Sequence, residues 1–174
     1  ARLAGHRNPA VLVGGLGMGY TVRAALDLLG AGARVVVGEL IGAVVAWNRD
    51  YLGDLAGHPL RDARVEVRVG DVGEIIRASA GAFDAILLDV DNGPEAFTDA
   101  RNAWLYSREG LRACLDALHA KGCLAIWSGF AAADAGFERR LRQEGLHYRR
   151  VPVPAYKGAR TFSRGIRLVA RAPG

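Results

Sequence analysis

Two carboxylates and an amide stand close together in one polar loop of the sequence. Asp89 directly follows the predicted strand Phe83–Leu88, and Asp91 and Asn92 come after Val90. Paired carboxylates can bind an amine or remove its proton. Asp, Asn, Gly and Pro are also ordinary turn residues, so the loop could be purely structural. We favour the catalytic interpretation for Asp89 and leave both interpretations open for Asp91.

A second motif contains four glycines within six positions, between the apolar run Ala10–Val13 and a helical pattern that begins at Tyr20. These are Gly14, Gly15, Gly17 and Gly19. Glycine lets the backbone turn sharply and lets a ligand approach without meeting a Cβ atom. A strand, a glycine turn and a helix together present a helix N-terminus to a ligand in open α/β sheets. A tight structural turn would look similar, but matching residues downstream favour ligand binding.

Glu39 lies 20 residues after Gly19, at the end of the predicted strand Arg34–Gly38. An acid at this place can accept hydrogen bonds from both hydroxyls of a ribose; the alternative is an ordinary surface glutamate. A dinucleotide fingerprint that starts at Gly15 would need a sixth-position glycine where the chain has Tyr20. The motif therefore predicts a nucleoside without a pyrophosphate.

Asp71 follows the predicted strand Arg64–Val69 and precedes the predicted helix Glu74–Ser79. Its carboxylate could accept from the exocyclic amino group of an adenine, or cap the helix, and both roles can coexist. Parallel sheets bind ligands outside the carboxyl ends of their strands. The glycine motif, Glu39, Asp71 and Asp89 should therefore line one rim of a sheet.

Strands and helices alternate along the chain. The predicted strands are Ala10–Val13, Arg34–Gly38, Arg64–Val69, Phe83–Leu88, Leu124–Trp127, Leu146–Val153 and Gly165–Ala170. The predicted helices are Tyr20–Leu29, Ile41–Leu55, Glu74–Ser79, Ala103–Ala120 and Asp134–Glu144. This alternation indicates a mostly parallel sheet with right-handed crossovers. The last two strands have no helix between them, so they should pair antiparallel at one edge. We predict one doubly wound, Rossmann-like α/β domain over residues 1–174, with seven strands and an antiparallel last strand.

Composition excludes several classes of protein. No run of 18 apolar residues exists, so we expect no membrane span, and the polar N-terminal residues do not resemble a signal peptide. Two cysteines, Cys114 and Cys123, make no disulfide framework and suit a reducing cytoplasm. The four histidines are scattered without a Cys/His cluster, so we expect no metal.

The net charge of +5 is unevenly distributed. From Arg139 onward the chain has ten basic residues and one acid, Glu144. Such a bias can mark a nucleic-acid surface. Aromatic residues are not regularly interleaved with these arginines, however, so we favour an arginine-rich solvated surface and expect no nucleic-acid partner.

The segments GGLGMG, VVVGEL, VRVGDV, FDAILLDVDNGP, LYSREGL and LAIWSG together resemble the spermidine synthase-like branch of the class I S-adenosylmethionine-dependent transferases. The resemblance runs from Val11 to about Trp127. It implies the class I methyltransferase fold and a cofactor site. In that family, residues matching Gly14–Gly19 lie alongside the methionine-derived part of the nucleotide. The residue matching Glu39, beside Leu40, holds the ribose, and those matching Asp71 and Val72 flank the adenine.

The same resemblance implies catalytic roles. The residue matching Asp89 is the proposed base toward the attacking amine and borders the cofactor, Asp91 would bind the amine, and Tyr156 resembles a tyrosine that lines the amine site. Three features depart from the aminopropyltransferase pattern. The aspartate of the motif GGGDGG is replaced by Gly17, the catalytic loop Asp-x-x-Asp-Pro is re-spaced, and the N-terminal β-domain is absent from these residues.

Three functions remain open at this point. The first expectation is a polyamine-biosynthesis transferase that moves an aminopropyl group from decarboxylated S-adenosylmethionine to an amine and releases methylthioadenosine. The alternative is a methyltransferase that uses intact S-adenosylmethionine on a small molecule and releases S-adenosylhomocysteine. A third is a nucleoside-binding domain without catalysis. The resemblance also allows a homodimer, and no N-P-P-Y motif points to a nucleic-acid substrate.

Overall fold

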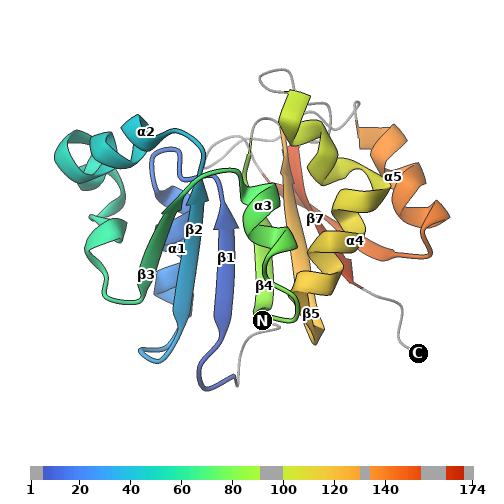
Figure 1. Cartoon of the computed structure of the whole chain (residues 1–174), viewed down its shortest axis with the longest axis horizontal. Coiled ribbons are helices and arrows are strands. Elements are labelled where there is room, and N and C mark those ends of the chain that lie inside the picture. The colour runs from blue at the N-terminus through green and yellow to red at the C-terminus, as the bar shows by residue number, and fades with distance from the viewer. Residues whose placement is uncertain (1–5, 91–99, 130–133, 154–163, 171–174) are drawn as a thin grey trace.

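Seven strands form one sheet in the order β3-β2-β1-β4-β5-β7-β6 (Figure 1). The computed structural model describes residues 6–90, 100–129, 134–153 and 164–170. The strands are β1 (Ala10–Gly14), β2 (Arg34–Glu39), β3 (Val65–Val69), β4 (Phe83–Leu88), β5 (Leu118–Ser128), β6 (His147–Val153) and β7 (Arg164–Ala170). The first five strands pair in parallel, and β7 runs antiparallel between β5 and β6. The predicted doubly wound fold is confirmed.

The strand order reverses between β1 and β4. The chain first builds outward from β1 to β3, and then returns to place β4 on the other side of β1, with Val13 opposite both Val37 and Leu87. Connections leave the sheet in opposite directions on the two sides of such a switch point, which opens a crevice above the carboxyl ends of the two strands. The fold therefore provides a ligand crevice where Gly14 ends β1 and Leu88 ends β4.

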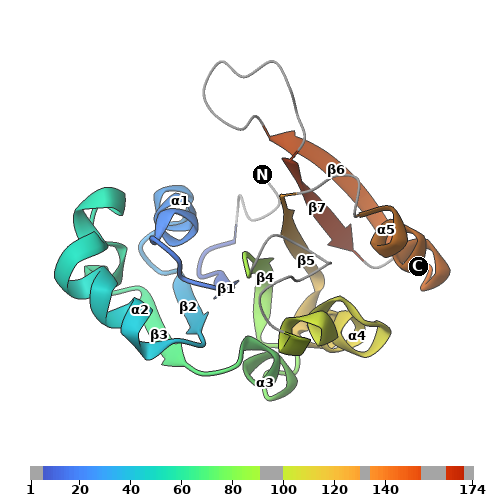
Figure 2. The same cartoon turned by 90° about the horizontal axis from the view of Figure 1, so that it is seen from above.

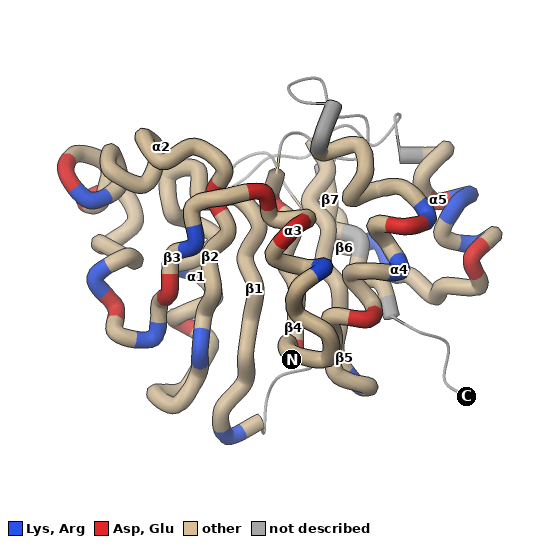
Figure 3. The backbone as a smooth tube through the Cα atoms, viewed as in Figure 1, with Lys and Arg blue, Asp and Glu red and all other residues tan. Residues whose placement is uncertain are grey.

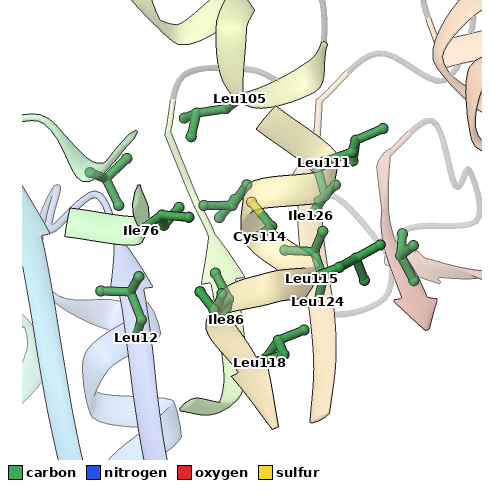
Figure 4. Packing of buried hydrophobic residues seen from close by; sticks show 14 of the residues in the cluster. Leu12, Ile76, Ile86, Leu105, Leu111, Cys114, Leu115, Leu118, Leu124 and Ile126 are labelled. Carbon is green, nitrogen blue, oxygen red and sulfur yellow. The ribbon is translucent and has the colours of Figure 1, made fainter. Parts of the chain in front are cut away.

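Helices cover both faces of the sheet (Figure 2). They are α1 (Tyr20–Leu28), α2 (Gly42–Trp47), α3 (Val72–Arg77), α4 (Arg108–Ala117) and α5 (Asp134–Gln143). Successive residues of a strand point to opposite faces. Val11 and Val13 accordingly pack into a core with α1 and α2 residues. Leu12 belongs to the core on the other face, which includes residues of α3, α4 and α5; Figure 4 labels Ile76 of α3 and Leu111, Cys114 and Leu115 of α4 in this core. No helix in the described part of the chain is long and apolar enough to cross a membrane.

The second predicted helix, Ile41–Leu55, is not one regular α-helix. It begins as α2, widens into the π-helix η1 (Asn48–Leu52) and ends in the 3₁₀-helix η2 (Gly53–Ala56), before a further 3₁₀ turn, η3 (Pro59–Arg61). Periodic apolar residues indicate that such a segment is helical, but they do not distinguish the three helix types.

The predicted helix Ala103–Ala120 is wrong at both ends. Its first part is the 3₁₀-helix η4 (Ala100–Tyr106), and α4 begins only after Ser107, whose Oγ accepts from the N–H of Gly110 at 3.1 Å. At the other end Leu118 already belongs to β5 and pairs with Phe83 of β4. Leucine fits a buried helix or a buried strand, and the neighbouring strand decides between them.

The side chain of Arg64, just before β3, connects that strand to the C-terminal end of α1 by hydrogen bonds. Its Nη1 donates to the carbonyl oxygens of Leu29 at 2.7 Å and Leu26 at 3.1 Å, which a helix end leaves without helical partners. Its Nη2 pairs with Asp62 at 2.7 Å. The hydrogen bond from Arg64 lowers the pKa of Asp62 from its ordinary 3.8 to about 2. Arg64 and Asp62 therefore connect the residues before β3 to the end of α1, which β2 and the following helices separate in the sequence.

Candidate nucleoside site

The carboxyl ends of β1, β2 and β4 are joined by backbone hydrogen bonds. The N–H of Gly15 donates to the Gly38 carbonyl, and the N–H of Asp89 donates to the Gly14 carbonyl, both at 2.8 Å. The N–H of Gly70 in turn donates to the Glu39 carbonyl at 2.9 Å. The structure thus brings the glycine motif and the three predicted acids to one continuous rim, as the sequence predicts.

The glycine loop, residues 14–19, needs glycine at specific points. Gly15, Gly17 and Gly19 have φ values of +88°, +50° and +85°, a region that side chains disfavour. A Cβ atom on Gly15 would lie 2.5 Å from the carbonyl oxygen of Asp89, whereas one on Gly17 would meet nothing within 4 Å. Gly19 is the N-cap of α1 and offers no side-chain acceptor to the first N–H groups of that helix.

Glu39 anchors the glycine loop. Its side chain is only 8% exposed. Oε2 accepts from the N–H of Leu16 at 2.9 Å, and Oε1 accepts from the N–H of Ile41 at 2.8 Å. A carboxylate oxygen can accept two hydrogen bonds, so each oxygen retains a second acceptor position. Glu39 can therefore shape the loop and still receive the hydroxyls of a ribose.

Asp89 is held from two sides. Its Oδ2 accepts from Oγ1 of Thr21, in the first turn of α1, at 2.5 Å. The buried Tyr106 donates from its hydroxyl to the carbonyl oxygen of Val90, the next residue, at 3.2 Å. Neither partner was assigned a role by sequence reasoning: Thr21 lies in a helical stripe, and Tyr106 lies in a motif quoted only for resemblance. Their contacts orient the candidate base.

Asp71 caps helix α3, which is one of the two roles that the sequence predicts for it. Its Oδ1 accepts from the N–H of Gly73 at 2.8 Å, which caps α3, so α3 begins earlier than the predicted Glu74. Val72 is buried, and its Cγ2 methyl group would lie 3.0 Å from a Cβ on Gly14. Leu40, next to Glu39, is 39% exposed and offers apolar surface at the rim. The adenine-flanking roles of these residues remain predictions.

Asp91 and Tyr156 lie outside the described residues. Within the described ranges, no group of three His, Cys, Asp or Glu side chains could hold a metal ion.

The strand order, the glycine loop after β1 and the acid after β2 define a Rossmann-like fold of the class I methyltransferase type, and solved structures agree. Spermidine synthase from Thermotoga maritima superposes with a TM-score of 0.72 at 21% identity, over 97% of this chain and 55% of that chain. A spermidine synthase in complex with the transition-state analogue AdoDATO superposes with a TM-score of 0.71 at 20% identity, over 97% of this chain and 55% of the other. Human methyltransferase-like protein 13, in complex with SAH, superposes with a TM-score of 0.68 at 18% identity, over 95% of this chain and 73% of that chain.

The sequence profile of the Spermine/spermidine synthase domain matches residues 5–158, and the chain belongs to that family. A polyamine aminopropyltransferase from Bacillus mycoides is 39% identical over 85 residues, and one from a Thermoanaerobacter species is 35% identical over 85 residues. Each alignment covers 48% of this chain and 30% of the relative. The resemblance stated from the motifs is confirmed, while the chain matches under a third of the length of these curated relatives.

Proposed function

We propose that this chain carries the nucleotide site and the base of an aminopropyltransferase. The carrying observation is the position of Asp89 at the switch point, beside the glycine loop and on the same rim as Glu39. Membership of the spermine/spermidine synthase family supports the same reaction. The acceptor would be a small amine, as the names of the curated relatives suggest.

The residues present fit a nucleoside bearing a sulfonium. Glu39 has acceptor positions left for ribose hydroxyls, and Gly15 and Gly17 keep side chains away from the ligand. Asp71 and Val72 would flank the adenine. When bound, decarboxylated S-adenosylmethionine supplies an electrophilic carbon next to its sulfonium, and its thioether product is the leaving group.

Asp89 would accept the proton that the attacking amine loses as the new C–N bond forms and the C–S bond breaks. Thr21 donates to Oδ2. Among the described residues Oδ1 receives no hydrogen bond, so this oxygen can take the amine proton. Asp91 and Tyr156 would bind the amine. Positioning and one base suffice, because the sulfonium is already an activated leaving group.

Methyl transfer from intact S-adenosylmethionine is the second candidate. It is favoured by one observation: Gly17 stands where the aminopropyltransferase motif has an aspartate, and the space beyond its Cα is open. The carboxylate of the intact nucleotide would meet no acidic side chain there. A nucleoside-binding role without catalysis is the third.

One experiment separates these functions. The protein is incubated with either nucleotide and a panel of small amines, and the products are identified by mass spectrometry. Methylthioadenosine together with an aminopropylated amine is the expected result. S-adenosylhomocysteine with a methylated product would favour methyl transfer, and nucleotide binding without either product would favour the third function.

A further inference from the structure

The segment that follows Glu39 returns to touch the glycine loop. We call residues 42–61, from α2 through η3, the α2 arm; it forms the outer end of the molecule beside α1 and β3 (Figures 1 and 2). A Cβ atom on Gly19 would lie 2.8 Å from Cγ of Pro59, 3.2 Å from Oδ1 of Asn48 and 3.6 Å from Cβ of Ala56. The arm thus packs directly on the loop backbone.

Asn48, the first residue of the π-helix, makes the polar contact. Its side chain is 2% exposed, and Nδ2 donates to the carbonyl oxygens of Gly17 at 2.7 Å and Val44 at 3.0 Å. Two acceptors on the same side define the orientation of the amide, because the flipped amide would point its oxygen at both carbonyls. Oδ1 is then buried and has no hydrogen-bond partner among the described residues.

Stability by itself gives no net reason for an asparagine at this position, because the unpaired Oδ1 offsets the two hydrogen bonds that Nδ2 donates. A buried acceptor without a partner destabilises the folded state relative to an apolar side chain of similar shape. The side chain of Asn48 does fix the carbonyl group of Gly17 through a hydrogen bond. Gly17 has a φ of +50°, and a Cβ atom built on it would meet nothing within 4 Å, so side-chain packing at that point does not hold the residue in place. The π-helix places the amide at this point, and such turns frequently occur at functional sites.

We propose that Asn48 is a positioning residue that holds Gly17, and with it the loop that faces the nucleotide tail beyond the ribose. The inference rests on the proposed function, in which Glu39 holds the ribose and residues 14–19 pass the tail. It adds a residue from outside the rim, which contacts the loop from behind rather than the ligand.

The test compares two substitutions in the arm. Asn48→Leu removes the donor and the unpaired acceptor at similar size. We expect its thermal stability to change little, because removal of the unpaired acceptor offsets the loss of the two donated hydrogen bonds. Its affinity for S-adenosylmethionine should fall about tenfold, the effect of one lost hydrogen bond. Affinity for adenosine, which has no tail, should change little. Asn48→Ala, which cannot overpack, serves if the leucine variant does not fold.

Val45→Ala is the matched control, because Val45 is buried in α2 and packs in the core rather than on Gly17. It should lower stability and leave affinity unchanged. Unchanged affinity of both Asn48 variants would overturn the proposal, as would an equal loss for adenosine or an equal loss in Val45→Ala.

A second measurement keeps the inference separate from the proposed function. If the unmodified protein binds neither form of the nucleotide, the proposed function fails, and amide hydrogen exchange without ligand then tests Asn48. The N–H of Gly19 donates to the Leu16 carbonyl at 2.8 Å inside the loop. Its exchange should be faster in Asn48→Leu than in Val45→Ala; equal exchange would overturn the inference.

Discussion

At the residue scale, each candidate acid binds the protein's own groups as well as the proposed ligand. Glu39 accepts from Leu16 and Ile41, Asp71 caps α3, and Asp89 accepts from Thr21. A substitution at any of them therefore changes local structure together with the proposed chemistry. Tests at this scale need a control that separates the two effects.

Replacement of Glu39 by alanine should weaken nucleoside binding. Two ribose hydroxyls lose a charged acceptor worth about 1.5–3 kcal/mol, or roughly 10- to 100-fold in affinity. The melting temperature should fall as well, because the N–H of Leu16 loses its acceptor. Calorimetry with S-adenosylmethionine and methylthioadenosine measures the affinity, and Glu66→Ala, at an exposed position of β3, is the control. Equal affinities would remove Glu39 from the site.

Asp89→Asn should reduce turnover by roughly 10²–10⁴-fold, the usual contribution of a general base, while nucleotide affinity changes little. Thr21→Val should lower kcat by a smaller factor with little change in KM, because it removes the hydroxyl that orients Oδ2. Thr21→Ser keeps that hydroxyl and should restore the rate. If Asp89→Asn loses binding and rate together, Asp89 is a nucleotide ligand or a fold determinant instead.

Gly17 should decide which nucleotide the loop admits. The unmodified protein should bind intact S-adenosylmethionine at least as tightly as the decarboxylated form. Gly17→Asp should reverse this preference by about 1 kcal/mol or more, because a carboxylate repels that of the intact form and attracts the terminal ammonium of the other. Space is open at this point and aspartate tolerates positive φ, so the variant should fold.

Gly17→Asn is the matched control, because asparagine has nearly the same shape as aspartate and also tolerates a positive φ, but carries no charge. It should leave the preference unchanged. A clear preference of the unmodified protein for the decarboxylated nucleotide would contradict this prediction and favour a dedicated aminopropyltransferase.

At the element scale, side chains from other elements close the ends of helices. Arg64, just before β3, holds the last carbonyls of α1, and Arg140 of α5 donates from Nη1 to the Tyr106 carbonyl of η4 at 2.6 Å. Tyr106 in turn holds the carbonyl of Val90, beside Asp89. The elements around the rim are therefore connected by specific polar contacts in addition to the two cores.

The Asp62–Arg64 pair predicts a pH dependence of stability. Because the pKa of Asp62 is lowered to about 2 in the folded protein, the unfolded chain binds more protons between that pH and its ordinary 3.8. The stabilisation should be complete above the ordinary pKa and disappear as pH falls to about 2. Unfolding of the wild type and Asp62→Asn, measured from pH 2 to 6, should therefore converge at low pH. Asp50→Asn, which removes one exposed carboxylate from η1, is the control.

At the scale of the whole molecule, the basic C-terminal segment from Arg139 onward makes ion pairs within the chain. Figure 3 shows basic and acidic positions together around α5. Arg150 pairs with Glu138 at 2.6 Å, and Arg108 pairs with Glu144 at 2.7 Å. The first pair joins β6 to α5, and the second joins α4 to the residue that follows α5. The chain covers about half the length of the solved spermidine synthases, 55% in each case, and its described residues form one seven-stranded sheet.

The sequence by itself determined the number of strands, the order in which strands and helices follow one another along the chain, and the acids at the strand ends. These follow from local patterns, because apolar runs, helical periodicity and glycine turns act over a few residues. Only the tertiary structure decided that Leu118 belongs to β5. The helical pattern of the sequence includes Leu118, but in the folded protein this residue pairs with Phe83 of β4. The tertiary structure alone also paired Thr21 with Asp89, 68 positions apart, and Asn48 with Gly17, 31 positions apart. No local pattern encodes contacts between residues that only the folded sheet brings together.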